Sequence, residues 1–438
     1  MEGIAVHYYW VHIYKVRFSV LSLLLFRFPK MESHRPPHGY MPIILSPTRD
    51  YLSEYEALLA ARDYHGVSGD FRVVAYNVLA DYCLSETPHL YEHCPPQCLD
   101  LMRRCQFISA ELRYLKPTVL CLQEVDQGFT HYFKTVRNAQ WLYKKRSDPS
   151  KRDGVAIVFD SEVFDLVETA EVEYKSSEIR RLDRPNVGLI AVLRSKATPN
   201  QGIIVGNTHL LFNFRRGDIQ LSQLLLFLSA VQNTQLRYES QLTLSIILAG
   251  DYNFTPSSPL YKFITERELD MSAVPPPHLA DRNAGDTRMV GCGQALQDRV
   301  LRRYRYQAKL RYQGDIQLGK ELSCLTVELV SGEGGKLIYQ PTIREGTQDH
   351  ILRLSLPLQS AYVSVTGREG FPFGYIDRVV FTTDYLWHCG ELQATGALLP
   401  PHYASLFEAP SLPTAHYPSD HISLAVDFAW RRTESSLG

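Results

Sequence analysis

The sequence lacks several features that would assign a protein to a structural class at once. Its 8 cysteines include no C-x-x-C pair and no regular spacing, which indicates reduced intracellular thiols without a disulfide framework or a zinc site. The net charge is only -1, so any nucleic-acid partner must be attracted by a local patch. The apolar stretch Phe18 to Phe26 is too short to predict a membrane span.

What is present describes an ordinary folded protein. The 438 residues are 45% hydrophobic and 21% charged, enough for one large α/β domain or two small ones. Residues 1–30 predict either a targeting segment or extra sequence upstream of a start at Met31. Residues 31–70 predict a linker and N-terminal extension, and 71–432 the main folded domain, with a tail at 433–438. Within the domain, 279–346 is polar, irregular and rich in Gly and Arg, which predicts a long surface insertion.

One stretch, Leu244 to Phe254 (LSIILAGDYNF), organises the chain. Its β-branched apolar run predicts a strand buried on both faces, and it ends at Gly250, where a tight turn is permitted. Asp251 and Asn253 follow and can be presented toward one side. Such a carboxylate and carboxamide can accept a proton from water, orient that water or help to hold a hard cation. The alternative is an Asp/Asn turn after a core strand.

Other predicted strands end in the same way. Strands are expected at 71–77, 118–125, 154–159, 187–193, 203–209, 375–382 and 422–430, with helices after Asp100 and after 214–218. The polar residues at their ends are Asn77, Glu124, His209 and the pair Asp420 and His421. In an α/β sandwich, loops at one edge of two packed sheets can gather such residues into one pocket.

The ordered motifs AYN, LQEV, GNTHL, GDYN, YID and SDH resemble those of the endonuclease/exonuclease/phosphatase superfamily. Within it, RLDRPNVGL, GNTHLLFN with RRGDIQLSQL, and SPLYKFI resemble the branch of nocturnin, the poly(A) deadenylases and, most closely, the Angel proteins. The resemblance implies a single DNase I-like catalytic domain, a four-layer α/β/β/α sandwich. It also implies Mg²⁺-dependent cleavage of an RNA phosphoester, with Mn²⁺ as a substitute ion. The deadenylase relatives remove 3′ adenylates, and Angel-type enzymes are associated with opening 2′,3′-cyclic phosphates.

The resemblance also implies a role for each matched residue. Glu124 is the first choice as metal ligand, with Asn77 beside it and Asp420 completing the shell. Asp251 draws a proton from the attacking water, and Asn253 orients Asp251 or the phosphate. The remaining expected catalytic residues are His421 on the scissile phosphate, Asp377 fixing its tautomer, and His209 on the other side. Relatives more often carry Tyr where Arg378 stands here, which puts the local pocket shape in doubt.

Candidate substrate contacts follow the same motifs. Arg215 and Arg216 come just after the His209 loop and are expected to contact phosphate, as are the basic runs 144–146 and 151–152. Tyr252 and Phe212, and also Tyr82 and Phe373, are candidates for stacking on a base. Solvated charged faces and core packing are the alternatives for these two sets.

Two other functions remain open from the sequence. FPFGYID (371–377) resembles sphingomyelinases, so a phosphoesterase acting on a lipid or inositol phosphate is one alternative. The other is an inactive scaffold for RNA or translation factors. Partners are expected to be RNA, through a 3′ end or poly(A) tail, and translation or mRNA-decay factors, for a monomer without stable membrane association. Location is expected to be cytoplasmic or nuclear, or mitochondrial if residues 1–30 are a targeting segment. The sequence contains no leucine-rich repeat for docking into a large deadenylase complex.

Overall fold

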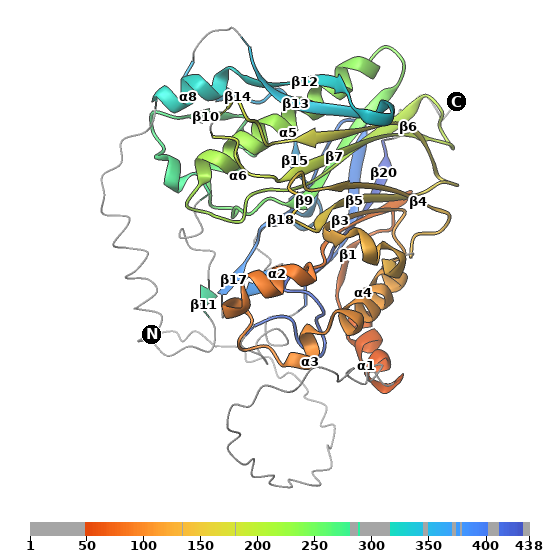
Figure 1. The fold of residues 1–438 in the computed structure, drawn as a ribbon. Helices are drawn as coiled ribbons and strands as arrows, with labels where there is room; N and C mark the ends of the chain where they lie inside the picture. Colours follow the sequence, from red (N-terminus) through yellow and green to blue (C-terminus); the bar gives the residue numbers. More distant parts are fainter. Residues whose placement is uncertain are drawn as a thin grey trace, which may run out of the picture. The chain divides into compact units, whose positions relative to one another are not determined.

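The structure is a computed structural model that describes residues 49–133, 135–179, 181–280, 288–289, 316–344, 349–369, 374–376, 379–401 and 411–431. Two large mixed sheets form its centre (Figure 1). The first sheet has the order β1-β19-β20-β2-β3-β5-β4. Its strands are β1 (Tyr64–Gly66), β2 (Phe71–Asn77), β3 (Val119–Asp126), β4 (Ala139–Lys145), β5 (Asp153–Asp160), β19 (Leu392–Leu398) and β20 (Leu424–Trp430).

The second sheet has the order β12-β13-β6-β7-β8-β9-β18-β15. Its strands are β6 (Phe164–Glu173), β7 (Val187–Ser195), β8 (Gln201–His209), β9 (Thr243–Asp251), β12 (Leu325–Ser331), β13 (Leu337–Ile343), β15 (Gln359–Ser360) and β18 (Asp384–Cys389). In each sheet, two neighbouring strands of the predicted set run parallel, β2 with β3 and β8 with β9. Their carboxyl ends therefore lie at one edge of each sheet.

Helices cover the outer face of each sheet. On the first sheet lies α4 (Leu101–Leu115), on which α1 (Arg49–Ala60) and α3 (Pro96–Leu99) pack, and α2 (Asp81–Glu86) lies beyond the strand ends (Figure 1). On the second lie α5 (Gly217–Tyr238), α6 (Pro259–Glu266) and α8 (Ile316–Ser323), and α9 (Ala361–Thr366) packs near β18 and β19. Short strand pairs complete the described chain: β10 (Glu268–Asp270) with β14 (Ile351–Arg353), and β11 (Arg288–Met289) with β17 (Val379–Phe381), which also pairs with β16 (Gly374–Ile376).

Strand alternation divides the core into three layers. Val73 of β2 and Val205 of β8 face the space between the two sheets. The neighbouring residues point to the opposite face of each sheet. Val74 of β2 packs on Ile108 of α4, and Ile204 of β8 packs with the apolar stripe of α5. This is the predicted four-layer α/β/β/α sandwich. The helix after Asp100 is confirmed too, because the Asp100 side chain accepts a hydrogen bond from the Arg103 N–H and caps α4.

Three expectations about elements were wrong. The expected strand 375–382 is divided into the short strands β16 and β17. Part of the expected insertion 279–346 is integral to the fold, because the hairpin β12–β13 joins the second sheet through β6. The expected linker contains the helix α1, whose Tyr55 packs on Phe107 at 5.0 Å and donates a hydrogen bond to Glu111.

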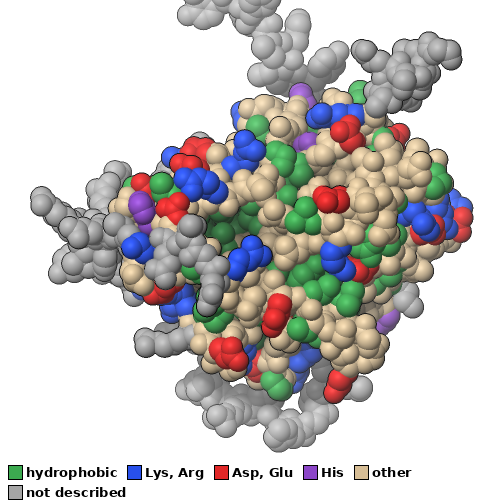
Figure 2. Space-filling view, turned by 90° about the horizontal axis from the view of Figure 1, so that it is seen from above, with side chains coloured by type: hydrophobic (Ala, Val, Ile, Leu, Met, Phe, Trp, Pro, Cys, Tyr) green, Lys and Arg blue, Asp and Glu red, His purple; other side chains and the backbone are tan. Residues whose placement is uncertain are grey.

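Surface and thiol chemistry agree with the composition. Within the described chain, Cys83, Cys94, Cys98, Cys105, Cys121, Cys324 and Cys389 are all unpaired. On the face shown in Figure 2, Lys and Arg side chains lie among Asp and Glu side chains, as the small net charge requires. A search of the described helices finds none of the length and hydropathy needed to cross a membrane.

Candidate active site

Strand pairing brings two of the predicted residues, His209 and Asp251, into adjacent positions. His209 at the end of β8 pairs with Asp251 at the end of β9, and Asp251 pairs on its other side with Asp384 of β18. The approach of β8 is close, because a Cβ atom on Gly250 would lie 2.2 Å from the carbonyl oxygen of Thr208. Glycine is therefore needed one residue before Asp251, where the sequence places it.

Glu124 is directed into the site by a β-bulge. The pairing of β3 with β5 shifts register between Gln123 and Val125, and Glu124 between them has a φ of 57°. Six described non-glycine residues have positive φ, and three of them, Leu79, Glu124 and Asn253, lie at this edge of the sandwich. Such strained conformations gather where a site demands one particular side-chain direction.

Asn77 holds the two carboxylates by donating hydrogen bonds. Its Nδ2 atom lies 3.0 Å from Glu124 Oε1 and 3.2 Å from Asp251 Oδ2. Its Oδ1 atom accepts from the Leu79 N–H at 3.1 Å, and this contact fixes the orientation of the amide. Asn77 thus lies beside Glu124 as expected, with its NH₂ group toward the two carboxylates, and its role as a metal ligand stays a prediction. The Ala80 N–H completes the support of Glu124 by donating to Oε2 at 3.0 Å.

Asp251 lies at the centre of the cluster and is 2% exposed. Its Oδ2 atom is 3.5 Å from His209 Nε2 and 3.7 Å from His421 Nε2. Its Oδ1 atom accepts from the backbone N–H of Asn253 at 3.0 Å, so Asn253 does orient this carboxylate, through its main chain. The Asn253 side chain instead donates to the Leu210 carbonyl.

A second carboxylate of the site, Asp384, contacts His421. Its Oδ2 atom lies 2.8 Å from His421 Nδ1, the position that was expected for Asp377. Asp377 itself lies outside the described residues. Asp384 is followed by Tyr385, the residue that relatives more often carry after this aspartate, whereas Asp377 is followed by Arg378. The sequence therefore contained the signal, but the motif was matched to Asp377 instead of Asp384.

The electrostatics of His421 follow from the acids around it. Burial disfavours its charged form, but Asp384, Asp420 and Asp251 outweigh burial and raise its pKa well above the usual value. Because Nδ1 faces Asp384, the Nε2 atom is the one directed toward Asp251. The pair Asp384 and His421 thus holds a proton next to the central carboxylate.

Glu124 and Asp420 form a second electrostatic centre. Burial raises the pKa of Asp420, and the negative charge of Glu124 raises it further. Burial alone would raise the pKa of Glu124, but His209, Asn77 and the Ala80 N–H outweigh burial and lower it. Tyr91, which the sequence analysis missed, donates to Asp420 Oδ2 at 2.9 Å. Two carboxylates that repel each other, Asp420 buried and Glu124 partly buried, are a donor set suited to a hard divalent cation.

A further group of described residues could also hold a metal. Ligand atoms of Asp251, Asp384 and His421 all lie within 4.8 Å of one another. The short contact between Asp384 and His421 Nδ1 already accounts for two members of this group. The carboxylates of Glu124 and Asp420 are therefore the stronger candidates for a metal site. His209 Nδ1 is buried without a hydrogen-bond partner and lies 4.0 Å from Glu124 Oε1, so an unsatisfied polar atom also faces this position.

The predicted substrate contacts fare less well. Tyr252 is fully buried in the core against Phe254 and Tyr385, so the prediction that it stacks on a base is wrong. Both Arg216 hydrogen bonds, at 3.0 Å, go to Asp218. Arg215 and Phe212 are exposed, with Phe212 at 49%, and their substrate contacts stay predictions.

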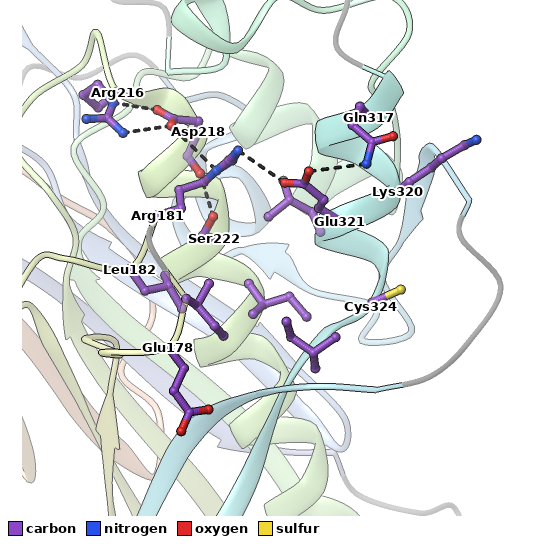
Figure 3. Close-up of a pocket in the computed structure, with 14 residues that line it drawn as sticks. Glu178, Arg181, Leu182, Arg216, Asp218, Ser222, Gln317, Lys320, Glu321 and Cys324 are labelled. Atoms are coloured by element: carbon purple, nitrogen blue, oxygen red, sulfur yellow. Dashed lines mark hydrogen bonds and ion pairs between the residues drawn. The ribbon is translucent and has the colours of Figure 1, made fainter.

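A cavity of about 730 Å³ lies outside this cluster (Figure 3). It is walled by Glu178, Ile179, Arg181 and Leu182, the start of α5, α8 and the β12–β13 hairpin. Arg216 lines it, and Asp218 links Arg216 to Arg181, which also pairs with Glu321 at 3.3 Å. The ion pairs among Arg181, Arg216, Asp218 and Glu321 thus lie within its wall, and none of its lining residues belongs to the catalytic cluster.

Sequence comparison identifies the family. A model of the Endonuclease/Exonuclease/phosphatase family matches residues 104–421. The chain belongs to this family. It is 38% identical over 216 residues to Protein angel homolog 2 of Homo sapiens, which is 47% of this chain and 39% of that protein. It is 27% identical over 401 residues to Carbon catabolite repressor protein 4 homolog 5 of Arabidopsis thaliana, covering 86% of this chain and 81% of that protein.

Comparison of structures agrees with the sequence. A crystal structure of ANGEL2, a 2′,3′-cyclic phosphatase, in complex with adenosine-2′,3′-vanadate has a TM-score of 0.66 and 26% identity. The similarity covers 84% of this chain and 98% of that one. The resemblance to the Angel branch is therefore confirmed. The chain nevertheless spans less than half the length of the curated Angel relatives that it matches.

Proposed function

We propose that this protein is a metal-dependent RNA phosphoesterase that opens 2′,3′-cyclic phosphates at RNA ends. The observation that carries the proposal is Asp251, a buried carboxylate 3.5 Å from His209 Nε2 and 3.7 Å from His421 Nε2. The similarity to ANGEL2, whose structure holds an adenosine-2′,3′-vanadate, favours the cyclic phosphate as substrate.

The residues fit a divalent cation, and we propose Mg²⁺. Glu124 and Asp420 are the proposed ligands, because both offer oxygen atoms and their mutual repulsion is relieved by a cation. When bound, the ion would neutralise charge that develops on the phosphate. Asn77 and the Ala80 N–H would keep Glu124 in place through the contacts described above.

The remaining chemistry is carried by side chains of this chain. Asp251 accepts a proton from water, whose oxygen forms a new bond to phosphorus. One ester bond of the cyclic phosphate breaks, and its ribose oxygen takes up a proton. His209 and His421 face Asp251 with their Nε2 atoms and would hold the phosphate oxygens by hydrogen bonds. Asp384 keeps His421 in that orientation.

Two labelled RNAs test the proposal, one ending in a 2′,3′-cyclic phosphate and one in a short adenylate tail. With Mg²⁺, the protein should convert the first to an open phosphate without shortening it. Progressive shortening of the second would instead place the chain with the deadenylases. Inaction on both by folded protein would contradict the proposal and favour a lipid or inositol phosphate substrate, or a scaffold. Glu124→Gln serves as the inactive control.

A further inference from the structure

A partly buried arginine lies beside the catalytic cluster without being part of it. Arg146 begins the loop between β4 and β5, and its side chain is 17% exposed. Its Nε atom is 3.0 Å from Asp153 Oδ2, and the other oxygen of Asp153 accepts a hydrogen bond from the Tyr82 hydroxyl at 2.6 Å. Asp153, which is 1% exposed, thus fixes both side chains.

Among the residues that the structure describes, the guanidinium group of Arg146 forms its ion pair with Asp153, and neither of its terminal nitrogens makes a hydrogen bond. Neighbouring cations differ in this respect. Lys144 pairs with Glu171 and Glu173, Lys145 donates to the Asp148 carbonyl, and Lys151 pairs with Glu86. Of this basic run, Arg146 is the residue that is both mostly buried and incompletely hydrogen-bonded.

Arg146 is held close to the proposed metal site. Tyr82 lies two residues after Ala80, whose N–H supports Glu124. Across the β3–β5 pair, Asp153 faces Asp126, which lies two residues after Glu124. Burial alone would lower the pKa of Arg146, but Asp153, Tyr82, Cys83 and Glu124 raise it, so the cation lies within the field of Glu124.

Burying a guanidinium costs several kcal/mol unless its hydrogen bonds are satisfied. One carboxylate at one nitrogen leaves this group incompletely satisfied, and the terminal nitrogens of an arginine match the oxygens of a phosphate. We propose that Arg146 binds a phosphate of the substrate through its terminal nitrogens, with Asp153 and Tyr82 as positioning residues. The inference rests on the proposed function, because it takes the substrate to be an RNA phosphoester.

Arg146→Met tests the inference, with Arg137→Met as the matched control. Arg137 is an exposed arginine just before the start of β4, at the opposite end of that strand from Arg146, so its replacement removes the same charge elsewhere. We expect Arg146→Met to raise KM by roughly 10–100-fold through the loss of a charge-assisted hydrogen bond, and Arg137→Met to change it by less than about 3-fold. Arg146→Lys should recover only part of the loss, because lysine keeps the positive charge but lacks the planar pair of N–H donors of the guanidinium group.

Two substrates show which phosphate Arg146 binds. Adenosine 2′,3′-cyclic phosphate carries the reacting phosphate alone, and a short RNA with the same end also carries the phosphates of the neighbouring nucleotides. A higher KM on both assigns Arg146 to the reacting phosphate, and a higher KM on the RNA alone assigns it to a neighbouring one. Equal KM values for Arg146→Met and Arg137→Met on both substrates would overturn the inference. Asp153→Asn should raise KM in the same direction while kcat changes less.

Binding separates this inference from the proposed function. The full chain would be titrated with a labelled RNA ending in a 3′-phosphate, in EDTA, over a series of salt concentrations. Weaker binding by Arg146→Met than by Arg137→Met, with a salt slope lower by about one charge, would support the inference even if no turnover is seen. Turnover by the wild type together with equal binding and KM in both variants would overturn the inference alone. If the wild type neither binds nor turns over RNA, both fail.

Discussion

The Nδ1 atom of His421 lies 2.8 Å from Oδ2 of Asp384, on the strand next to the one that ends in Asp251. His421 precedes β20 in the first sheet, and Asp384 begins β18 in the second. This contact therefore ties the two sheets together at the site. It also fixes which nitrogen of His421 is directed toward Asp251.

Asp384→Asn should reduce kcat on cyclic-phosphate RNA by roughly a hundredfold or more, because an amide can bind His421 Nδ1 in the wrong tautomer. The measurement is steady-state kinetics, with thermal unfolding to confirm the fold. Asp377→Asn is the matched control and should retain near wild-type kcat. A strong loss in Asp377→Asn with little change in Asp384→Asn would show that the original assignment to Asp377 was right.

Glu124→Gln should abolish both turnover and the stabilisation produced by Mg²⁺. A ligand that binds the folded state at about 100 times its Kd stabilises by about 2.7 kcal/mol, which raises Tm. Without metal, the variant should unfold near the wild-type temperature, because the amide oxygen can still accept from Ala80 and the repulsion of Asp420 is removed. An undiminished Mg²⁺-induced rise in Tm would refute Glu124 as a ligand.

Arg104→Met should raise the Mg²⁺ concentration needed for half-maximal activity by about 10-fold or more. Arg104 is 1% exposed and donates to the carbonyls of Val78 and Leu79, the turn whose N–H groups hold Asn77 and Glu124. Its Nε and Nη2 atoms are buried without partners. The loss of these hydrogen bonds is partly offset because a buried charge is removed. The free energy of unfolding should therefore change less than the Mg²⁺ concentration needed for half-maximal activity. An unchanged Mg²⁺ requirement would remove Arg104 from the support of the site.

His388 should make stability sensitive to mild acid. Its side chain is 3% exposed, and burial lowers its pKa to about 4. Between about pH 6.5 and pH 4 the unfolded chain binds a proton that the folded protein does not, so the free energy of unfolding falls by about 1–3 kcal/mol as pH decreases. Denaturant unfolding of the wild type and His388→Gln across this range checks the effect. The variant should lose less stability over the same interval, and equal losses would contradict the assignment.

The sequence predicted the centre of the fold well. Runs such as those of β2, β3, β8 and β9 are buried on both faces, so their apolar residues are continuous and easily recognised. Their polar ends share one edge because each pair is parallel, which also made Asn77, Glu124, His209 and Asp251 predictable as a group.

What the sequence did not reveal depends on partners distant in the chain. The strand β18 contains Trp387 and His388 after Asp384, and this mixed composition does not resemble a buried run, so its aspartate was overlooked. The hairpin β12–β13 looked irregular because one side of it is partly exposed at the sheet edge. Tyr252 was taken for a site residue because it lies between Asp251 and Asn253, but its side chain packs into the core.

Oxygen-isotope transfer is the most direct test of the central claim that Asp251 activates water to open a phosphoester. Cyclic-phosphate RNA would be incubated with protein and Mg²⁺ in ¹⁸O-labelled water, and the terminal phosphate analysed by mass spectrometry. The account predicts one ¹⁸O atom per product phosphate with the wild type and no product above background with Asp251→Asn of equal thermal stability. Product formation at an undiminished rate by Asp251→Asn, or no product from folded wild type, would contradict it.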